Sequence, residues 1–219
     1  MVEFARKNVS DPMKHLEPGR LIPGLAAALA IAIGGISLAA WGVGRWDWLT
    51  LGESYVPVAP VTAMVFLLLG GSLALRVWFA DRAFLMGLVR VGLGLSTLFA
   101  GTELVRTRWP MVPPWDRWGS AVELGYGAIQ IRMAPMTAAV CILTAGAMIG
   151  TCPNFSLPKW TQLVARFAGA GGILLSGLVI LAYAAGTPLG YANGQVPMAW
   201  LTALGFLSLC GGGSGGGPR

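Results

Sequence analysis

Charged residues and metal-binding side chains are scarce in this chain. Only 11% of its 219 residues are charged and 55% are hydrophobic, whereas soluble domains carry about 25% charged residues. There are three cysteines, no Cys-x-x-Cys pair and one histidine, His15. These counts exclude a zinc finger, a disulfide scaffold and a multi-histidine metal centre. They also argue against a soluble domain and against disorder, which needs few apolar residues and much charge.

Catalytic constellations are missing as well. The chain has no evident Ser/His/Asp set and no pair of carboxylates suited to acid–base work. We therefore predict no catalytic residue, no bound metal and no enzymatic activity. Lys and Arg number 15 against 9 Asp and Glu, a formal charge of +6. In so apolar a chain this surplus is a topology signal, and we expect no nucleic-acid partner.

Long apolar runs dominate what remains. A helix needs about 20 mostly apolar residues to cross roughly 30 Å of hydrocarbon. These runs are apolar on every side, which favours helices over barrel strands. The sequence thus predicts an all-α integral membrane protein with six spans. They are Leu21–Gly44, Val61–Phe79, Phe84–Val105, Met136–Thr151, Leu163–Gly186 and Met198–Gly211.

The predicted organisation is a cytoplasmic segment 1–20, a membrane domain 21–211 and a Gly-rich tail or linker 212–219. Residues 1–20 lack the apolar core of a signal peptide. Within the membrane domain we expect three helical hairpins, 21–79, 84–151 and 163–211. Most tryptophans fall in the outer connections, and Trp109–Gln130 is typical of a segment lying in the membrane interface.

Basic residues near the span ends predict the orientation. The side that holds both termini has ten Lys or Arg against four acidic residues, whereas the other side has five of each. Because cytoplasmic connections carry the excess of Lys and Arg, we place both termini in the cytoplasm.

Three segments repeat without gaps at the start of the second helix of each hairpin. Each contains Thr-Ala followed by a glycine nine residues after the threonine: Gly71, Gly146 and Gly211. The helix-start residues are Pro60, Thr62, Pro135, Thr137, Pro197 and Thr202. Proline suits the first helical turn, and the threonine hydroxyl can bond a free backbone group there. Small residues elsewhere also predict close helix packing. They are Ala26, Ala30 and Gly34 in the first span, Gly87, Gly94 and Gly101 in the third, and Ala168, Gly172 and Ser176 in the fifth.

These repeats carry a family resemblance. Val58-Ala59-Pro60-Val61-Thr62-Ala63, Arg132-Met133-Ala134-Pro135-Met136-Thr137-Ala138 and Met198–Phe206 resemble signatures of the multi-pass membrane input region of bacterial sensor histidine kinases and diguanylate cyclases. The resemblance covers about residues 20–211. It implies a sensory domain in the bacterial inner membrane. The family's His-box, nucleotide-binding and GGDEF-like output sequences are absent from this chain, and Val61 and Met136 stand where the family often has Asn.

The candidate ligand or partner crevice lies on the outer side. Its aromatic and basic residues are Trp46, Trp48, Trp115, Trp118, Tyr126, Arg132 and Tyr191. They would rim the three Thr-Ala helix starts, whose N-termini attract anions. The alternative is a simple aromatic belt at the headgroup level.

Two charges fall inside the third span. Arg90 lies near the inner end and either snorkels, pairs with helix carbonyls or forms a functional polar site. Glu103 lies near the outer end and can pair with Arg106 or Arg132, in an interfacial ion pair worth little if exposed.

Two functions fit these patterns. The first is a non-enzymatic sensory input domain that relays an outer-leaflet or periplasmic stimulus by helix repacking. The second is an accessory or scaffold subunit of a larger respiratory or photosynthetic membrane complex. A transporter is weakened by the near absence of central polar groups. We expect no cofactor, although lipid or an apolar pigment could lie on the helix surfaces. The expected partners are membrane lipids and other membrane subunits or a second copy.

The orientation is testable with reporter fusions. Alkaline phosphatase fused after Arg219 should be inactive, and a fluorescent protein at either end should fluoresce, because both ends face the cytoplasm. A phosphatase fused within 110–130 should be active. An active phosphatase at the C-terminus contradicts the predicted topology.

Overall fold

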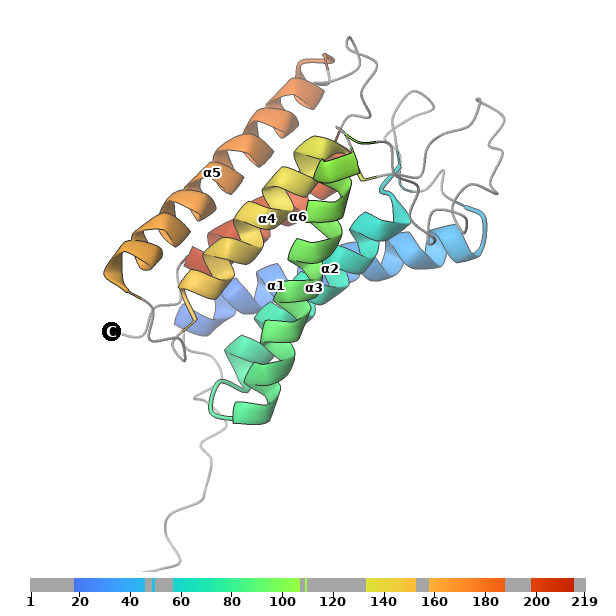
Figure 1. The fold of residues 1–219 in the computed structure, drawn as a ribbon. Coiled ribbons are helices and arrows are strands. Elements are labelled where there is room, and N and C mark those ends of the chain that lie inside the picture. Colours follow the sequence, from blue (N-terminus) through green and yellow to red (C-terminus); the bar gives the residue numbers. More distant parts are fainter. Residues whose placement is uncertain are drawn as a thin grey trace, which may run out of the picture.

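The computed structural model describes residues 18–45, 49, 57–106, 109, 133–152, 158–187 and 198–214. This part of the chain is entirely helical and contains no strand (Figure 1). The helices are α1 (Pro18–Gly42), α2 (Pro60–Trp78), α3 (Ala83–Arg106), α4 (Pro135–Gly150), α5 (Lys159–Ala184) and α6 (Trp200–Ser214). The predicted all-helical class is confirmed, and each helix begins within four residues of its predicted span.

Local sequence explains several helix ends. Pro60 and Pro135 begin α2 and α4, where a missing N–H costs nothing, and the preceding alanines are extended. Gly44 and Gly186 follow α1 and α5 with φ of 70° and 72°. These are left-handed values that glycine adopts without strain. The bonds from Gly44 N–H to Trp41 O and from Arg45 N–H to Ala40 O complete a Schellman cap.

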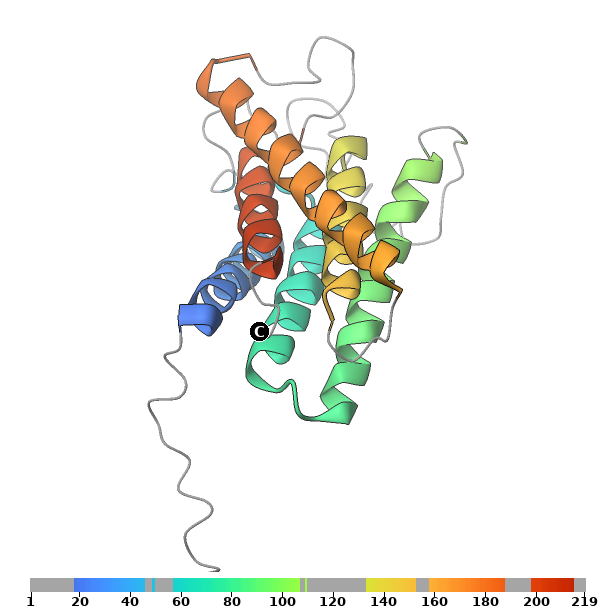
Figure 2. The same cartoon turned by 90° about the vertical axis from the view of Figure 1, so that its left-hand side faces the viewer.

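The helices form an inner and an outer set (Figures 1 and 2). The inner helices α2, α4 and α6 contact one another. Each outer helix lies against two inner ones: α1 on α2 and α6, α3 on α2 and α4, and α5 on α4 and α6. Successive helices run antiparallel. Because each outer helix contacts two inner helices, the outer set closes the three grooves between the inner helices.

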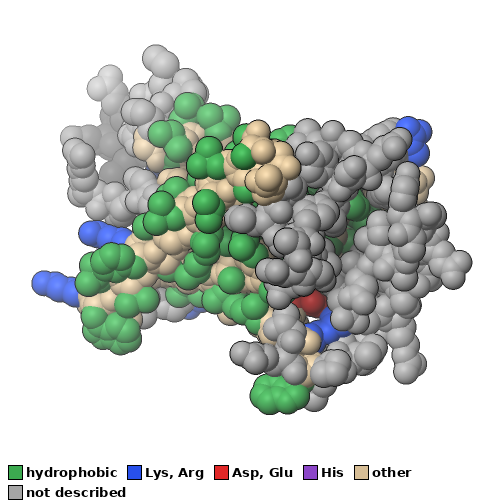
Figure 3. Space-filling model, turned by 90° about the horizontal axis from the view of Figure 1, so that it is seen from above, with side chains coloured by type: hydrophobic (Ala, Val, Ile, Leu, Met, Phe, Trp, Pro, Cys, Tyr) green, Lys and Arg blue, Asp and Glu red, His purple; other side chains and the backbone are tan. Residues whose placement is uncertain are grey.

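The outer helices turn small residues inward and large apolar residues outward. Ala30, Gly92 and Gly172 are buried against neighbouring helices. On the opposite face of α5, Leu174 is 73% exposed and Phe167 is 69% exposed. In Figure 3 hydrophobic side chains likewise dominate the coloured surface, and charged ones gather in few places. A surface this apolar is typical of helices surrounded by lipid.

Four helices of the described chain are long and apolar enough to cross a membrane: α1, α2, α3 and α5. The other two are shorter, with 16 residues in α4 and 15 in α6. At 1.5 Å per residue they extend about 24 Å and 22 Å, less than the roughly 30 Å of a hydrocarbon core.

One end of the bundle is basic. A methyl group on Gly212 of α6 would lie 2.7 Å from Ala26 Cβ near the start of α1, so these two ends adjoin. The turn between α2 and α3 and the start of α5 lie at the same end. Its exposed basic residues are Arg20, Arg82, Arg90, Lys159 and Arg166. We call it the basic end; the other end of the described helices carries Arg45, Glu103 and Arg106.

Several predicted packing glycines are not at helix contacts. No neighbouring atom lies within 4 Å of a methyl group built on Gly71, Gly146 or Gly211. The same holds for Gly87, Gly94 and Gly101, so these predictions were wrong. The reason is the orientation of α3 about its own axis. Its inward face is the buried four-residue series Gly92, Ser96 and Ala100. The predicted glycines lie on other faces of this helix.

Matched glycine substitutions in the inner helices test this packing. A methyl group on Gly205 would lie 2.7 Å from the ring of Phe66, which is fully buried, whereas one on Gly146 meets nothing. We expect Gly205→Ala to lower the free energy of unfolding by about 1–3 kcal/mol through overpacking. Gly146→Ala should leave it unchanged or raise it by up to about 1 kcal/mol, since alanine favours helix. Thermal unfolding in detergent micelles measures both, and equal effects would contradict the packing.

Candidate functional site

The predicted outer crevice lies outside the described residues. Its members Trp46, Trp48, Trp115, Trp118, Tyr126, Arg132 and Tyr191 all fall there, as does Pro197. The crevice therefore stays a prediction. The predicted helix-start residues are described, except for Pro197.

Each inner helix begins with the same two buried residues. Thr62, Thr137 and Thr202 are the third residues of α2, α4 and α6, and each is at most 2% exposed. The alanine after each threonine is fully buried. Its N–H donates to the carbonyl of an alanine four residues earlier, at 3.0, 2.9 and 3.0 Å in the three helices. The three Thr-Ala pairs thus occupy the same local position, pointing into the bundle.

The inner helices remain equivalent one turn further on. The residues four after the threonines are Phe66, Cys141 and Phe206, and none of them is exposed. The rings of Phe66 and Phe206 pack with centroids 4.9 Å apart and planes tilted by 43°. Aromatic pairs prefer such offset or tilted geometry. At the third position the smaller Cys141 lies 3.5 Å from the carbonyl of Ser96 in α3. The centre of the bundle is therefore apolar and closed.

The Trp41 side chain donates a hydrogen bond to a buried backbone carbonyl just before α2. The indole Nε1–H of Trp41, at the end of α1, donates to the carbonyl of Val58 at 2.7 Å. Val58 lies just before α2 and is buried together with Ala63 and Ala199. A buried carbonyl without a partner would cost free energy, particularly where water is scarce. This bond therefore holds the end of α1 against the start of α2.

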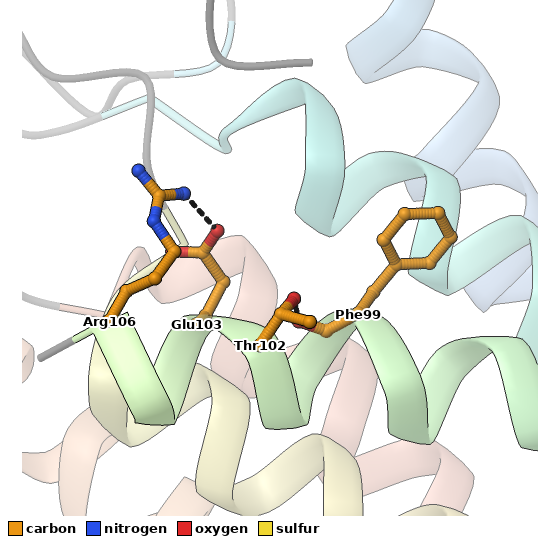
Figure 4. A network of polar contacts seen from close by, with 4 residues as sticks. All are labelled: Phe99, Thr102, Glu103 and Arg106. Atoms are coloured by element: carbon orange, nitrogen blue, oxygen red, sulfur yellow. Dashed lines mark hydrogen bonds and ion pairs between the residues drawn. The ribbon is translucent and has the colours of Figure 1, made fainter. Parts of the chain in front are cut away.

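Glu103 and Arg106 form an ion pair on α3 (Figure 4). Arg106 donates to Glu103 at 2.7 Å, and only 6% and 7% of the two side chains are exposed. The predicted alternative partner, Arg132, lies outside the described residues. The prediction treated the pair as worth little if exposed, but the structure buries it. Burial makes each partner costly to lose, because the charge left behind would be uncompensated.

Arg90 is exposed about two turns from the start of α3. It lines a surface hollow with Ala80, Asp81, Ala83 and Met86 at the turn between α2 and α3. This position is near the basic end, from which the long side chain can reach the membrane surface.

Arg76 has a role that the sequence analysis missed. It lies in the last turn of α2 and is only 9% exposed. Its guanidinium donates to Met148 O at 3.2 Å, to Thr151 Oγ1 at 2.9 Å and to Thr151 O. The last carbonyls of a helix lack partners within it and carry partial negative charge. Arg76 therefore caps α4 and ties two inner helices together.

A sequence signal for this cap exists. Helix α4 ends without a basic residue in its last turn, so its terminal carbonyls need a donor from elsewhere. Arg76 stands two residues before the end of the α2 run. Only the antiparallel packing of α2 and α4 with their ends adjoining identifies it as that donor.

A hydroxyl and a thiol make a further polar contact between described helices. Thr144 Oγ1 lies 3.2 Å from Cys210 Sγ, which joins α4 to α6. All three cysteines are free and buried. No group of three His, Cys, Asp or Glu residues that could hold a metal occurs among the described residues.

Comparison with known proteins identifies no relative. No protein-family model matches the sequence, and neither a curated protein nor a solved structure is detectably similar to the chain. The resemblance to sensor input regions therefore stays a prediction.

Removing Arg76 tests the cap. Arg76→Met keeps the apolar stem but removes the charged donor to Met148 O and Thr151 O, so we expect a loss of about 1–3 kcal/mol in the free energy of unfolding. Exposed Arg166, changed in the same way, is the control and should change stability by less than about 0.5 kcal/mol. Thermal unfolding in detergent micelles should respond to Arg76→Met alone. Equal stability of the two variants would show that the cap contributes nothing.

Proposed function

We propose that this chain is a non-enzymatic membrane sensory domain. A stimulus at the end of the bundle where α2, α4 and α6 begin, which we call the Thr-Ala end, shifts the packing of the inner helices. The observation that carries this proposal is the buried, equivalent start of α2, α4 and α6. A change at that end would act on all three inner helices together. Their opposite ends lie near the basic end, where α6 adjoins the start of α1.

The polar ties between described helices favour α6 as the helix that moves. Arg76 holds α4 to α2 through three hydrogen bonds. Helix α6 is joined to α4 by the contact between Thr144 Oγ1 and Cys210 Sγ at 3.2 Å, in which the thiol is a weak hydrogen-bonding group. Apolar contacts are less directional than hydrogen bonds, so a second packing of α6 costs less than one of α4.

The membrane arrangement belongs to the same proposal. We place all six helices across a bacterial inner membrane as three repeated hairpins, with both termini in the cytoplasm. The excess of exposed basic residues near one end supports this orientation. Helices α4 and α6 each have fewer than 18 residues, but both are apolar and pack between long outer helices. This packing supports counting them as membrane spans.

An accessory subunit of a larger membrane complex is the second candidate. The outward face of α5 favours it, since Phe167, Leu174 and Leu181 are each more than two-thirds exposed. Purification in nanodiscs followed by mass spectrometry of accompanying proteins separates the two. Stable stoichiometric companions favour the subunit, and a monodisperse chain without companions counts against it.

Spin-label distances test the repacking. Labels at Leu25→Cys on α1 and Gly211→Cys on α6 occupy exposed positions, and the native cysteines are buried. We expect two distance populations whose ratio changes between short-chain and long-chain phosphatidylcholine vesicles, because bilayer thickness biases helix packing. Leu25→Cys with Gly71→Cys on α2 is the matched control and should give one unchanged distance. A single α1–α6 distance in every vesicle would contradict the relay.

A further inference from the structure

The hollow at the turn between α2 and α3 is lined by one charge of each sign. Its volume is about 420 Å³, and its walls are Ala80, Asp81, Ala83, Met86 and Arg90. Asp81 and Arg90 are both exposed. Arg82, between them in sequence, lies with its guanidinium 5.9 Å from the centre of the Phe79 ring. The charged groups that line the hollow itself are therefore Asp81 and Arg90.

The two charges lie at different depths. Asp81 is in the turn, whereas Arg90 is seven residues beyond the first residue of α3, or about 10 Å along the helix axis. The Arg90 side chain can extend back toward the turn, which brings its guanidinium below the level of the Asp81 carboxylate. The hollow thus presents a cation on the membrane side and an acid on the water side.

Apolar residues continue the surface from Arg90 into the membrane. Val91 is 58% exposed and Leu98 is 61% exposed, and both lie beyond Arg90 along α3, away from the turn. Phe84, near the turn, is 77% exposed. Acyl chains can lie along this face while a headgroup fills the hollow.

We propose that this hollow binds the headgroup of a zwitterionic ethanolamine phospholipid. In such a lipid the phosphate is the deeper group and the ammonium the outer one. The phosphate would accept hydrogen bonds from Arg90, and the ammonium would donate to Asp81. A headgroup with only negative charge would be repelled by the Asp81 carboxylate. A choline headgroup has no N–H to donate to that carboxylate. The proposal rests on a membrane location and is independent of the sensory function.

Native mass spectrometry of the detergent-solubilised chain tests the preference. Ethanolamine, choline and glycerol phospholipids with identical acyl chains are titrated separately. We expect the ethanolamine lipid to bind most tightly. Asp81→Asn should abolish its advantage over the choline lipid, and Arg90→Gln should weaken all three lipids by roughly ten- to hundred-fold, as for the loss of one charge-assisted hydrogen bond.

Arg166→Gln is the matched control. Arg166 is the eighth residue of α5 as Arg90 is of α3, and it is likewise exposed, but it does not line the hollow. Its loss should leave all three affinities within about two-fold, a difference of ~0.4 kcal/mol. Equal binding of the three lipids, tightest binding of the glycerol lipid, or an equal effect of Arg90→Gln and Arg166→Gln would each overturn the proposal.

Discussion

Close packing of three inner helices is the constraint on which the rest of the structure depends. Where lipid surrounds a bundle, helices gain little from excluding apolar surface and must instead fit closely and satisfy their backbone groups internally. Phe66 and Phe206 fill the centre, and Gly205 allows the Phe66 ring to approach the α6 backbone. The outer helices then occupy the grooves with their small residues, which leaves their large apolar residues facing outward.

Polar groups follow from the same constraint. A hydroxyl or guanidinium brought inside such a core costs free energy when it lacks a partner, and helix carbonyls are available acceptors. Thr144 and Ser96 bond back to carbonyls of their own helices, whereas Arg76 reaches across to the end of α4. The cap therefore adds a directional tie between two inner helices that are otherwise held by apolar contact. The Thr144–Cys210 contact that joins α6 to α4 is weaker because it involves a thiol, and this difference underlies the proposed role of α6.

Charge distribution connects the fold to its surroundings. Exposed basic residues gather near the ends of α1, α3 and α5 that adjoin the inner-helix C-termini, where lipid phosphates and helix carbonyls both favour cations. At the opposite end Glu103 and Arg106 neutralise each other. Arg90 and Asp81 belong to the basic end but line a common hollow, so the same residues that indicate topology also shape a lipid contact.

Composition and run length by themselves determined the helical class, the approximate helix boundaries and the Thr-Ala starts, because lipid restricts a chain of this hydropathy to helices. They determined the inward faces only in part: the series Ala26, Ala30 and Gly34 of α1 is buried as its spacing predicts, but the glycine series predicted for α3 is not. The glycines expected at contacts, such as Gly94 and Gly146, meet no neighbour, while Gly92 and Gly205 do. Spacing in an apolar helix marks several faces equally well, and only the neighbouring helices select one. The same is true of Arg76: its sequence position marks a membrane boundary, but its function as a cap exists only because antiparallel packing brings the ends of α2 and α4 together.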